Sequence, residues 1–242
     1  MFPKSTNAGA VALLATPIVV IAAVLIQPTL SDDASTQVTA LTSHHQAMIT
    51  GLTLSIIALV LLIAGTLWLA LALAPRTPRL AIAGAVLSVF GALVVLFENS
   101  VAAAAPAIAS GLGHAQATAM LERVHSGAIA AVEPLALLGD IGVALLGIAA
   151  LKAGAPRWAA VAIAVGALGE GAGFATSTKA LVITSFALLF AGLLPAVRTL
   201  RTNTRPHPVA EPAPVTAVSW RKPGKTRGAA VAAGQRGDGR TS

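Results

Sequence analysis

The stretch LTLSIIALVLLIAGTLWLALALA, residues 52–74, contains no charged side chain. A helix needs roughly 20 apolar residues to cross a bilayer core about 30 Å thick, so this stretch is long enough to span a membrane. Further apolar runs resemble it, and the predicted spans cover residues 8–27, 47–74, 80–103, 126–151, 158–175 and 180–200. Because the runs are continuous rather than alternating, helices are favoured over the strands of a membrane barrel. The sequence therefore predicts an all-α polytopic membrane bundle of six transmembrane helices.

The composition excludes a single soluble catalytic domain. Of the 242 residues, 56% are hydrophobic and 10% are charged, whereas soluble domains have about 25% charged residues. The chain contains no cysteine, so it can form no disulfide, thiolate nucleophile, Cys-ligated zinc site or iron–sulfur cluster.

The distribution of basic residues predicts the orientation. If the amino terminus is cytoplasmic, every Lys and Arg except Arg123 and Lys179 lies on the cytoplasmic side, as the positive-inside rule requires. We therefore predict a multi-pass plasma-membrane protein with both termini in the cytoplasm. A cleaved secretory signal is the alternative for residues 8–27, but this run is longer than the 7–15 residues typical of a signal core, which favours a retained helix.

The segments between and after the spans are polar. Residues 28–46 are predicted to form a modest acidic loop, and residues 106–125 a helix that lies at the interface or extends its neighbours. Residues 1–200 form the predicted transmembrane domain, and residues 201–242, rich in Pro, Lys and Arg, form a predicted disordered cytoplasmic tail. This tail could contact anionic lipid headgroups. Nucleic-acid binding is disfavoured because the tail has no folded reader and no interleaved aromatic residues.

Carboxylates within the predicted spans are the main functional signal, because charges inside a bilayer are costly. Glu98, Glu133, Asp140 and Glu170 have no Lys or Arg at their own depth. Glu133 and Asp140 are seven residues apart, which places them on one helix face about 10 Å apart in height. One hypothesis is a proton or cation path past Glu133 to Asp140, with Glu170 and Glu98 nearby. The favoured alternative is that each acid is protonated and hydrogen-bonds between helices.

Two other patterns have bland explanations. The histidines and methionines predicted on the outer side could bind copper or zinc; they are His44, His45, His114, His125, Met48 and Met120. Because histidines in exposed loops are more often solvated than metal-bound, no metal site and no cofactor is predicted. Small residues that let helices approach closely are expected to pack the monomer, with a homodimer face as the alternative. They are Gly84, Gly91, Gly139, Gly142 and the Gly169-x-x-x-Gly173 motif.

The organisation of residues 8–201 resembles the small six-helix integral membrane proteins of unknown function from high-GC bacteria. The resemblance rests on the Ser-Asp-Asp-Ala loop at 31–34, the Ala-Pro-Arg-Thr-Pro-Arg-Leu hairpin at 74–80 and the Lys-Ala-Gly-Ala-Pro-Arg-Trp-Ala hairpin at 152–159. It implies a plasma-membrane helical bundle and carries over no functional residue.

Two functions remain open. The sequence contains no Walker loop, nucleophile elbow, zinc-protease helix or dinucleotide fingerprint, so an enzyme is not expected. This favours a structural, accessory or partner-binding membrane protein. The alternative is a proton- or cation-coupled secondary transporter that uses the intramembrane carboxylates. Convergence of Glu133, Asp140 and Glu170 on one water-accessible cavity would favour transport, whereas scattered acids would favour the accessory role.

Overall fold

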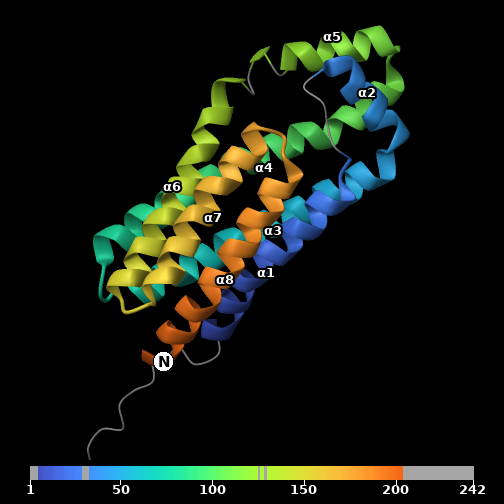
Figure 1. Ribbon diagram of the computed structural model, residues 1–242. Coiled ribbons are helices and arrows are strands. Elements are labelled where there is room, and N and C mark those ends of the chain that lie inside the picture. The colour runs from blue at the N-terminus through green and yellow to red at the C-terminus, as the bar shows by residue number, and fades with distance from the viewer. Residues whose placement is uncertain (1–4, 29–32, 125, 128–129, 204–242) are drawn as a thin grey trace, which may run out of the picture. The chain divides into compact units, whose positions relative to one another are not determined.

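The computed structural model describes residues 5–28, 33–124, 126–127 and 130–203, all within one unit, Met1–Arg205. This part of the chain is helical and contains no strand, as predicted. Its helices, shown in Figure 1, are α1 (Ser5–Ile26), α2 (Ala34–Ser43), α3 (His45–Leu73), α4 (Pro78–Gly111), α5 (His114–Val124), α6 (Ala130–Lys152), α7 (Arg157–Ala175) and α8 (Lys179–Asn203). The predicted tail lies outside the described residues from position 204 onward.

Six of these helices, α1, α3, α4, α6, α7 and α8, are long and apolar enough to cross a membrane. Large apolar side chains point outward along them: Leu71 is 76% exposed, Leu25 65% and Ile82 61%. A water-soluble bundle would cover such residues, whereas lipid is a favourable environment for them. The prediction of six transmembrane helices is confirmed.

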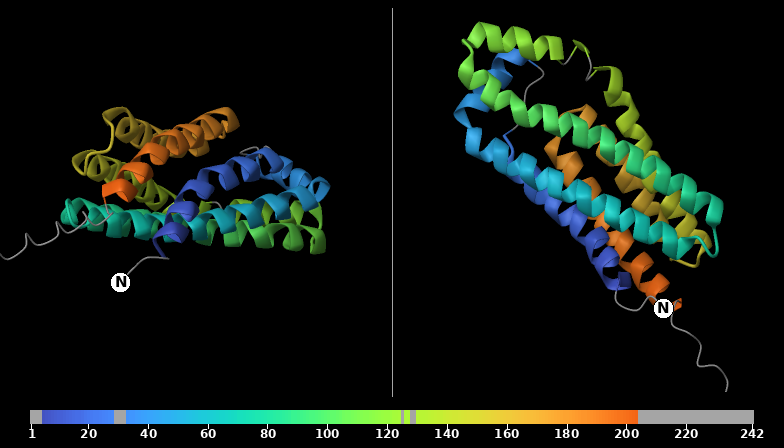
Figure 2. Two further views of the ribbon diagram at one scale, coloured as in Figure 1. Left: turned by 90° about the horizontal axis from the view of Figure 1, so that it is seen from below. Right: turned by 180° about the vertical axis from the view of Figure 1, so that it is seen from behind.

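The six spans form a closed ring. Each span packs against the next one along the chain, in the order α1, α3, α4, α6, α7 and α8, and α8 packs back against α1. Figures 1 and 2 show these long helices side by side, with α5 across one end. We call this end, formed by α2 and α5, the cap end, and the end with residues 74–77 and 153–156 the hairpin end. Helix α3 also contacts α6 and α8 across the ring.

Proline and glycine fix the turns at the hairpin end. Pro78 is the first residue of α4, where its missing N–H costs no hydrogen bond. Pro156 is the N-cap of α7. Between α6 and α7, Gly154 has a φ of 102°, a conformation that side chains rarely allow. These turns set the register in which neighbouring spans meet.

The cap end differs from the sequence prediction at residues 28–46. The predicted loop at 28–46 contains helix α2, whose N-cap Asp33 accepts hydrogen bonds of 2.7 Å from both the backbone N and the Oγ1 of Thr36. The side-chain hydrogen bond and then the backbone one hold the pKa of Asp33 below its ordinary value. Residues 106–125, predicted to be helical at the interface or as an extension of a neighbour, are helical in both ways, since α4 extends to Gly111 and α5 begins at His114.

Candidate functional site

Glycines set the contact between α4 and α6. An added Cβ on Gly91 would overlap the backbone of Gly139, one on Gly142 would lie 2.6 Å from Ser88 Oγ, and one on Gly84 would lie 2.8 Å from the Leu146 side chain. As residue numbers increase along α4, the residues they contact on α6 have decreasing numbers, so the two helices are antiparallel. The prediction that these small residues pack the monomer is confirmed. Gly169 and Gly173 likewise meet Ser185 and Val182 of α8.

The contact between α6 and α7 brings two acids together. An added Cβ on Gly171 would overlap the Asp140 carboxyl, and further along the pair one on Gly147 would lie 3.0 Å from Ile163. The Asp140 side chain thus rests against the α7 backbone at the residue next to Glu170. Asp140 lies near the middle of α6, and Glu170 lies five residues before the end of α7.

A cavity of about 80 Å³ lies within the ring, and all six spans contribute to its wall. Most of the wall is apolar. The polar side chains in it are Thr16 of α1, Thr66 of α3, Ser88 of α4, Asp140 of α6 and Glu170 of α7. A polar cavity can hold a water once it offers about 10–15 Å³, so this one has room for an ion or a few waters.

The acids in this cavity have no hydrogen-bond partner among the described residues. Among the described residues, no side chain or backbone group donates a hydrogen bond to the Asp140 or Glu170 carboxyl. Ser88 is 1% exposed, and its Oγ is buried without a hydrogen-bond partner. The Thr16 hydroxyl donates to the Ala12 carbonyl O at 2.9 Å, so only its lone pairs remain for another group. Oxygen acceptors therefore dominate the polar wall.

A second pair of acids lies nearer the cap end. Glu98 of α4 is close enough to Glu133 of α6 for their charges to interact. One oxygen of Glu98, Oε1, is buried without a hydrogen-bond partner, whereas Glu133 is exposed. Glu133 does not line the central cavity. It stands one heptad from Asp140, about 10 Å along α6.

The structure thus sorts the four predicted acids into two pairs. Asp140 and Glu170 share the cavity, and Glu98 and Glu133, whose charges interact, lie nearer the cap end. Of Glu133, Asp140 and Glu170, whose convergence on one cavity would favour transport, only Asp140 and Glu170 line it. Sequence analysis missed the hydroxyls of Thr16, Thr66 and Ser88, since isolated Thr and Ser residues are common in apolar helices. Their shared wall exists only once the ring closes.

The histidines do not assemble a metal site among the residues described. No group of three or more His, Cys, Asp or Glu side chains that could hold a metal ion occurs there. His114 Nε2 lies 3.4 Å from Thr39 Oγ1, which joins α5 to α2, and His44 and His45 stand at the α2–α3 junction. His125 lies outside the described residues.

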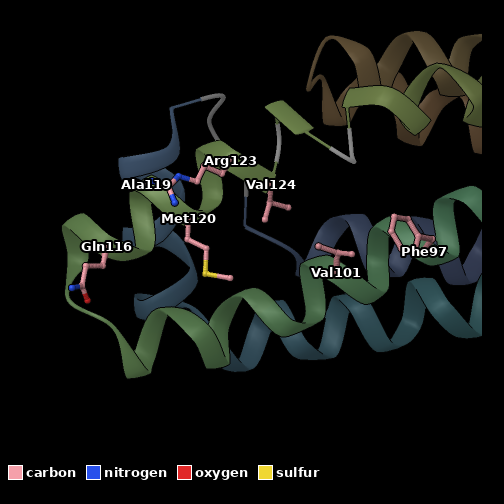
Figure 3. Close-up of a pocket in the computed structure, with 7 residues that line it drawn as sticks. All are labelled: Phe97, Val101, Gln116, Ala119, Met120, Arg123 and Val124. Carbon is pink, nitrogen blue, oxygen red and sulfur yellow. The ribbon is translucent and has the colours of Figure 1, made fainter.

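A separate groove of about 790 Å³ lies between α4 and α5 (Figure 3). It is mostly apolar, with the Met120 side chain pointing from α5 toward α4. Its lining residues are Phe97, Val101, Gln116, Ala119, Met120, Arg123 and Val124. The described residues that line this groove include no carboxylate, and none of them lines the central cavity.

Comparisons with protein-family models, with curated proteins and with solved structures found no match to this chain. Function is therefore inferred from the geometry of the chain itself.

Proposed function

We propose that this protein is a proton- or cation-coupled secondary transporter whose ion-binding centre is the Asp140–Glu170 pair. The observation that carries the proposal is the convergence of both acids on one internal cavity that all six spans line. Acids that merely stabilise helix packing would hydrogen-bond across an interface, but these two receive no such bond from the described residues. Intramembrane acids without basic partners are typical of ion and proton pathways.

The chemistry of the pair follows from its charge. Two ionised carboxylates at close range repel each other, and a proton or cation between them removes the repulsion. Removal of the ion restores it, so the packing of α6 against α7 depends on occupancy. This dependence is what coupled transport requires, because an ion can shift a conformational equilibrium only through its different affinities for the two states. The Glu98–Glu133 pair would pass the ion between the cap end and the centre.

The test measures ion flux in proteoliposomes, and a variant of an acid outside the cavity serves as the matched control. Full-length protein is reconstituted with a pH-sensitive dye inside, and an imposed proton or Na⁺ gradient drives dye response. Asp140→Asn and Glu170→Gln should lose the flux seen with the wild type. Glu122→Gln, which neutralises an exposed acid of α5 away from the cavity, should retain it. Flux that is unchanged in Asp140→Asn would remove the path.

A partner-binding role is the second candidate, and the groove between α4 and α5 favours it. An apolar groove of about 790 Å³ at the cap end could accept an apolar segment of another membrane protein. Co-purification in mild detergent with native mass spectrometry tests this role. A partner lost on Met120→Glu, but retained on Asp140→Asn, would favour the accessory function over transport.

A further inference from the structure

We infer that the groove between α4 and α5 binds one anionic phospholipid, with an acyl chain against Phe97, Val101 and Met120 and the phosphate on Arg123. The groove has a volume of about 790 Å³, which falls within the range of about 300–1,000 Å³ that is typical of ligand sites. It is therefore large enough to hold part of a single lipid molecule. The inference concerns a different site from the Asp140–Glu170 pair and does not depend on transport.

Helix α5 presents two faces, and one of them is covered by protein. Ala117 is 4% exposed and packs with Val38 of α2, and Leu121 packs against the same two residues. The other face lines the groove with residues 116, 119, 120 and 123, which recur at helical spacing. Met120 on this face is 40% exposed, and its side chain points toward α4 (Figure 3). The face toward α4 therefore leaves a groove that the described side chains do not fill.

The groove extends from the depth of the lipid chains to the end of the bundle. Phe97 is 48% exposed and lies within the candidate span Pro78–Ala104, about 10 Å before its last residue. Helix α5 has 11 residues, too few to cross a bilayer, and lies across the end of the bundle (Figures 1 and 2). A phospholipid has the same order of groups along its length, with apolar chains followed by a charged phosphate.

Arg123 supplies the charge that selects an anionic headgroup. Among the described residues that line the groove, it is the one charged side chain, and it is exposed. It makes no ion pair or hydrogen bond with another described residue. Lys179, also at the cap end, instead donates a hydrogen bond to the backbone O of Gln27. A guanidinium can bind a phosphate through two parallel hydrogen bonds, so Arg123 is suited to a lipid phosphate.

The acids next to the lining residues in sequence do not oppose this charge from within the groove. Glu98 follows Phe97, but it lies close enough to Glu133 of α6 for their charges to interact, and it does not line the groove. Glu122 precedes Arg123, and neighbouring positions on a helix point in different directions. An anionic headgroup at the groove therefore meets a cation, whereas an acidic segment of a partner protein would have no apolar chain to match Phe97.

The test is photo-crosslinking of full-length protein in nanodiscs of phosphatidylcholine. A trace of phosphatidylglycerol or phosphatidylcholine carries the same photoactivatable acyl chain, and the crosslinked residues are mapped by mass spectrometry. Ile49 of α3 is the internal reference, because it is 42% exposed near the cap end and does not line the groove. In the wild type, the ratio of phosphatidylglycerol to phosphatidylcholine crosslinks at residues 97–101 should be about fivefold higher than at Ile49. This factor corresponds to about 1 kcal/mol for a basic residue near an anionic surface.

Three variants separate the groove from the overall charge. Arg123→Gln should reduce the ratio at residues 97–101 to that at Ile49, whereas Arg123→Lys, which keeps the charge, should retain most of the preference. Lys179→Gln is the matched control, since it removes the same charge from the same end outside the groove, and it should leave the ratio unchanged. In nanodiscs of phosphatidylcholine, Arg123→Gln should melt as the wild type does, because Arg123 is exposed. Addition of phosphatidylglycerol should raise the melting temperature of the wild type more than that of this variant.

Four results would overturn the inference. They are equal ratios at residues 97–101 and at Ile49, a preference that persists in Arg123→Gln, a preference lost equally in Lys179→Gln, and displacement of the lipid by millimolar glycerol phosphate. The last result would identify a soluble phosphate ester as the ligand. A protein partner that is lost on Met120→Glu, without any lipid preference at the groove, would assign the groove to that partner. Ion flux in Asp140→Asn tests transport separately, so either proposal can fail while the other stands.

Discussion

Replacement of Gly91 by alanine should separate α4 from α6, whereas the same change at Gly139, across the same contact, should be far milder. A Cβ on Gly91 would overlap the Cα and N of Gly139 and lie 2.9 Å from the Ala136 carbonyl O. These are backbone atoms, which cannot turn aside as a side chain can. On Gly139 the nearest atom to an added Cβ is Gly91 Cα, at 3.2 Å, which a shift of a few tenths of an ångström relieves.

The magnitude comes from two opposing contributions. Alanine is about 1 kcal/mol more favourable than glycine within a helix. Overpacking of a tight contact costs about 1–3 kcal/mol. At Gly111, the last residue of α4, an added Cβ meets nothing within 4 Å, so Gly111→Ala has no overpacking and gains at most the first contribution. Gly91→Ala should therefore be about 2 kcal/mol less stable than Gly111→Ala, with Gly139→Ala between them.

Thermal unfolding in nanodiscs measures this difference. For a chain of this length, about 2 kcal/mol corresponds to roughly 4–8 °C in melting temperature. Gly91→Ala should also reduce the flux that depends on Asp140, because Gly91 lies on the cavity wall. Equal melting temperatures for Gly91→Ala and Gly139→Ala would refute the helix register on which the site is built.

Two further predictions concern the cap end and the orientation. The hydrogen bonds from Thr36 lower the pKa of Asp33, so the stability that this N-cap gives α2 is fully present above the unfolded pKa of about 3.9 and is lost as the pH falls through the lower folded pKa. An NMR titration of Asp33 should therefore give a midpoint below about 3.9. The variant Asp33→Ala should show faster amide exchange at Thr36 at neutral pH. Because the chain has no cysteine, the variants Arg76→Cys and Ser43→Cys each contain a single thiol that can be labelled. An impermeant maleimide added to intact cells should label Ser43→Cys and leave Arg76→Cys unlabelled. The reverse labelling pattern would show that the predicted topology is inverted.

The sequence predicted the spans well because each depends on local composition. An apolar run of about 20 residues is sufficient to place a helix in lipid, whatever its neighbours are. Helix α2 was missed because this criterion does not detect it: its sequence is rich in Ser and Thr and contains no apolar run. Its start is nevertheless encoded locally, in the spacing between Asp33 and Thr36 that forms the N-cap hydrogen bonds.

The site was predictable only in part, because it depends on which helices meet. Unpaired acids could be found in the sequence, and helical spacing put Glu133 and Asp140 on one face of α6. Their partners could not be found that way. Asp140 pairs with Glu170 across α6 and α7, and Glu133 with Glu98 across α4 and α6. Such pairing requires the register between helices, which the glycine contacts fix.

Packing and ion binding share the same residues in this bundle, and this constrains how the site can work. Asp140 sits against Gly171, so the carboxyl proposed to bind the ion is held at a point where two helices nearly touch. Tight contacts of this kind transmit small displacements because they cannot be compressed. An ion that draws Asp140 away from Gly171 would change the distance between α6 and α7. Any motion that opens the cavity should therefore be a movement of whole helices about these glycine contacts rather than a rotation of one side chain.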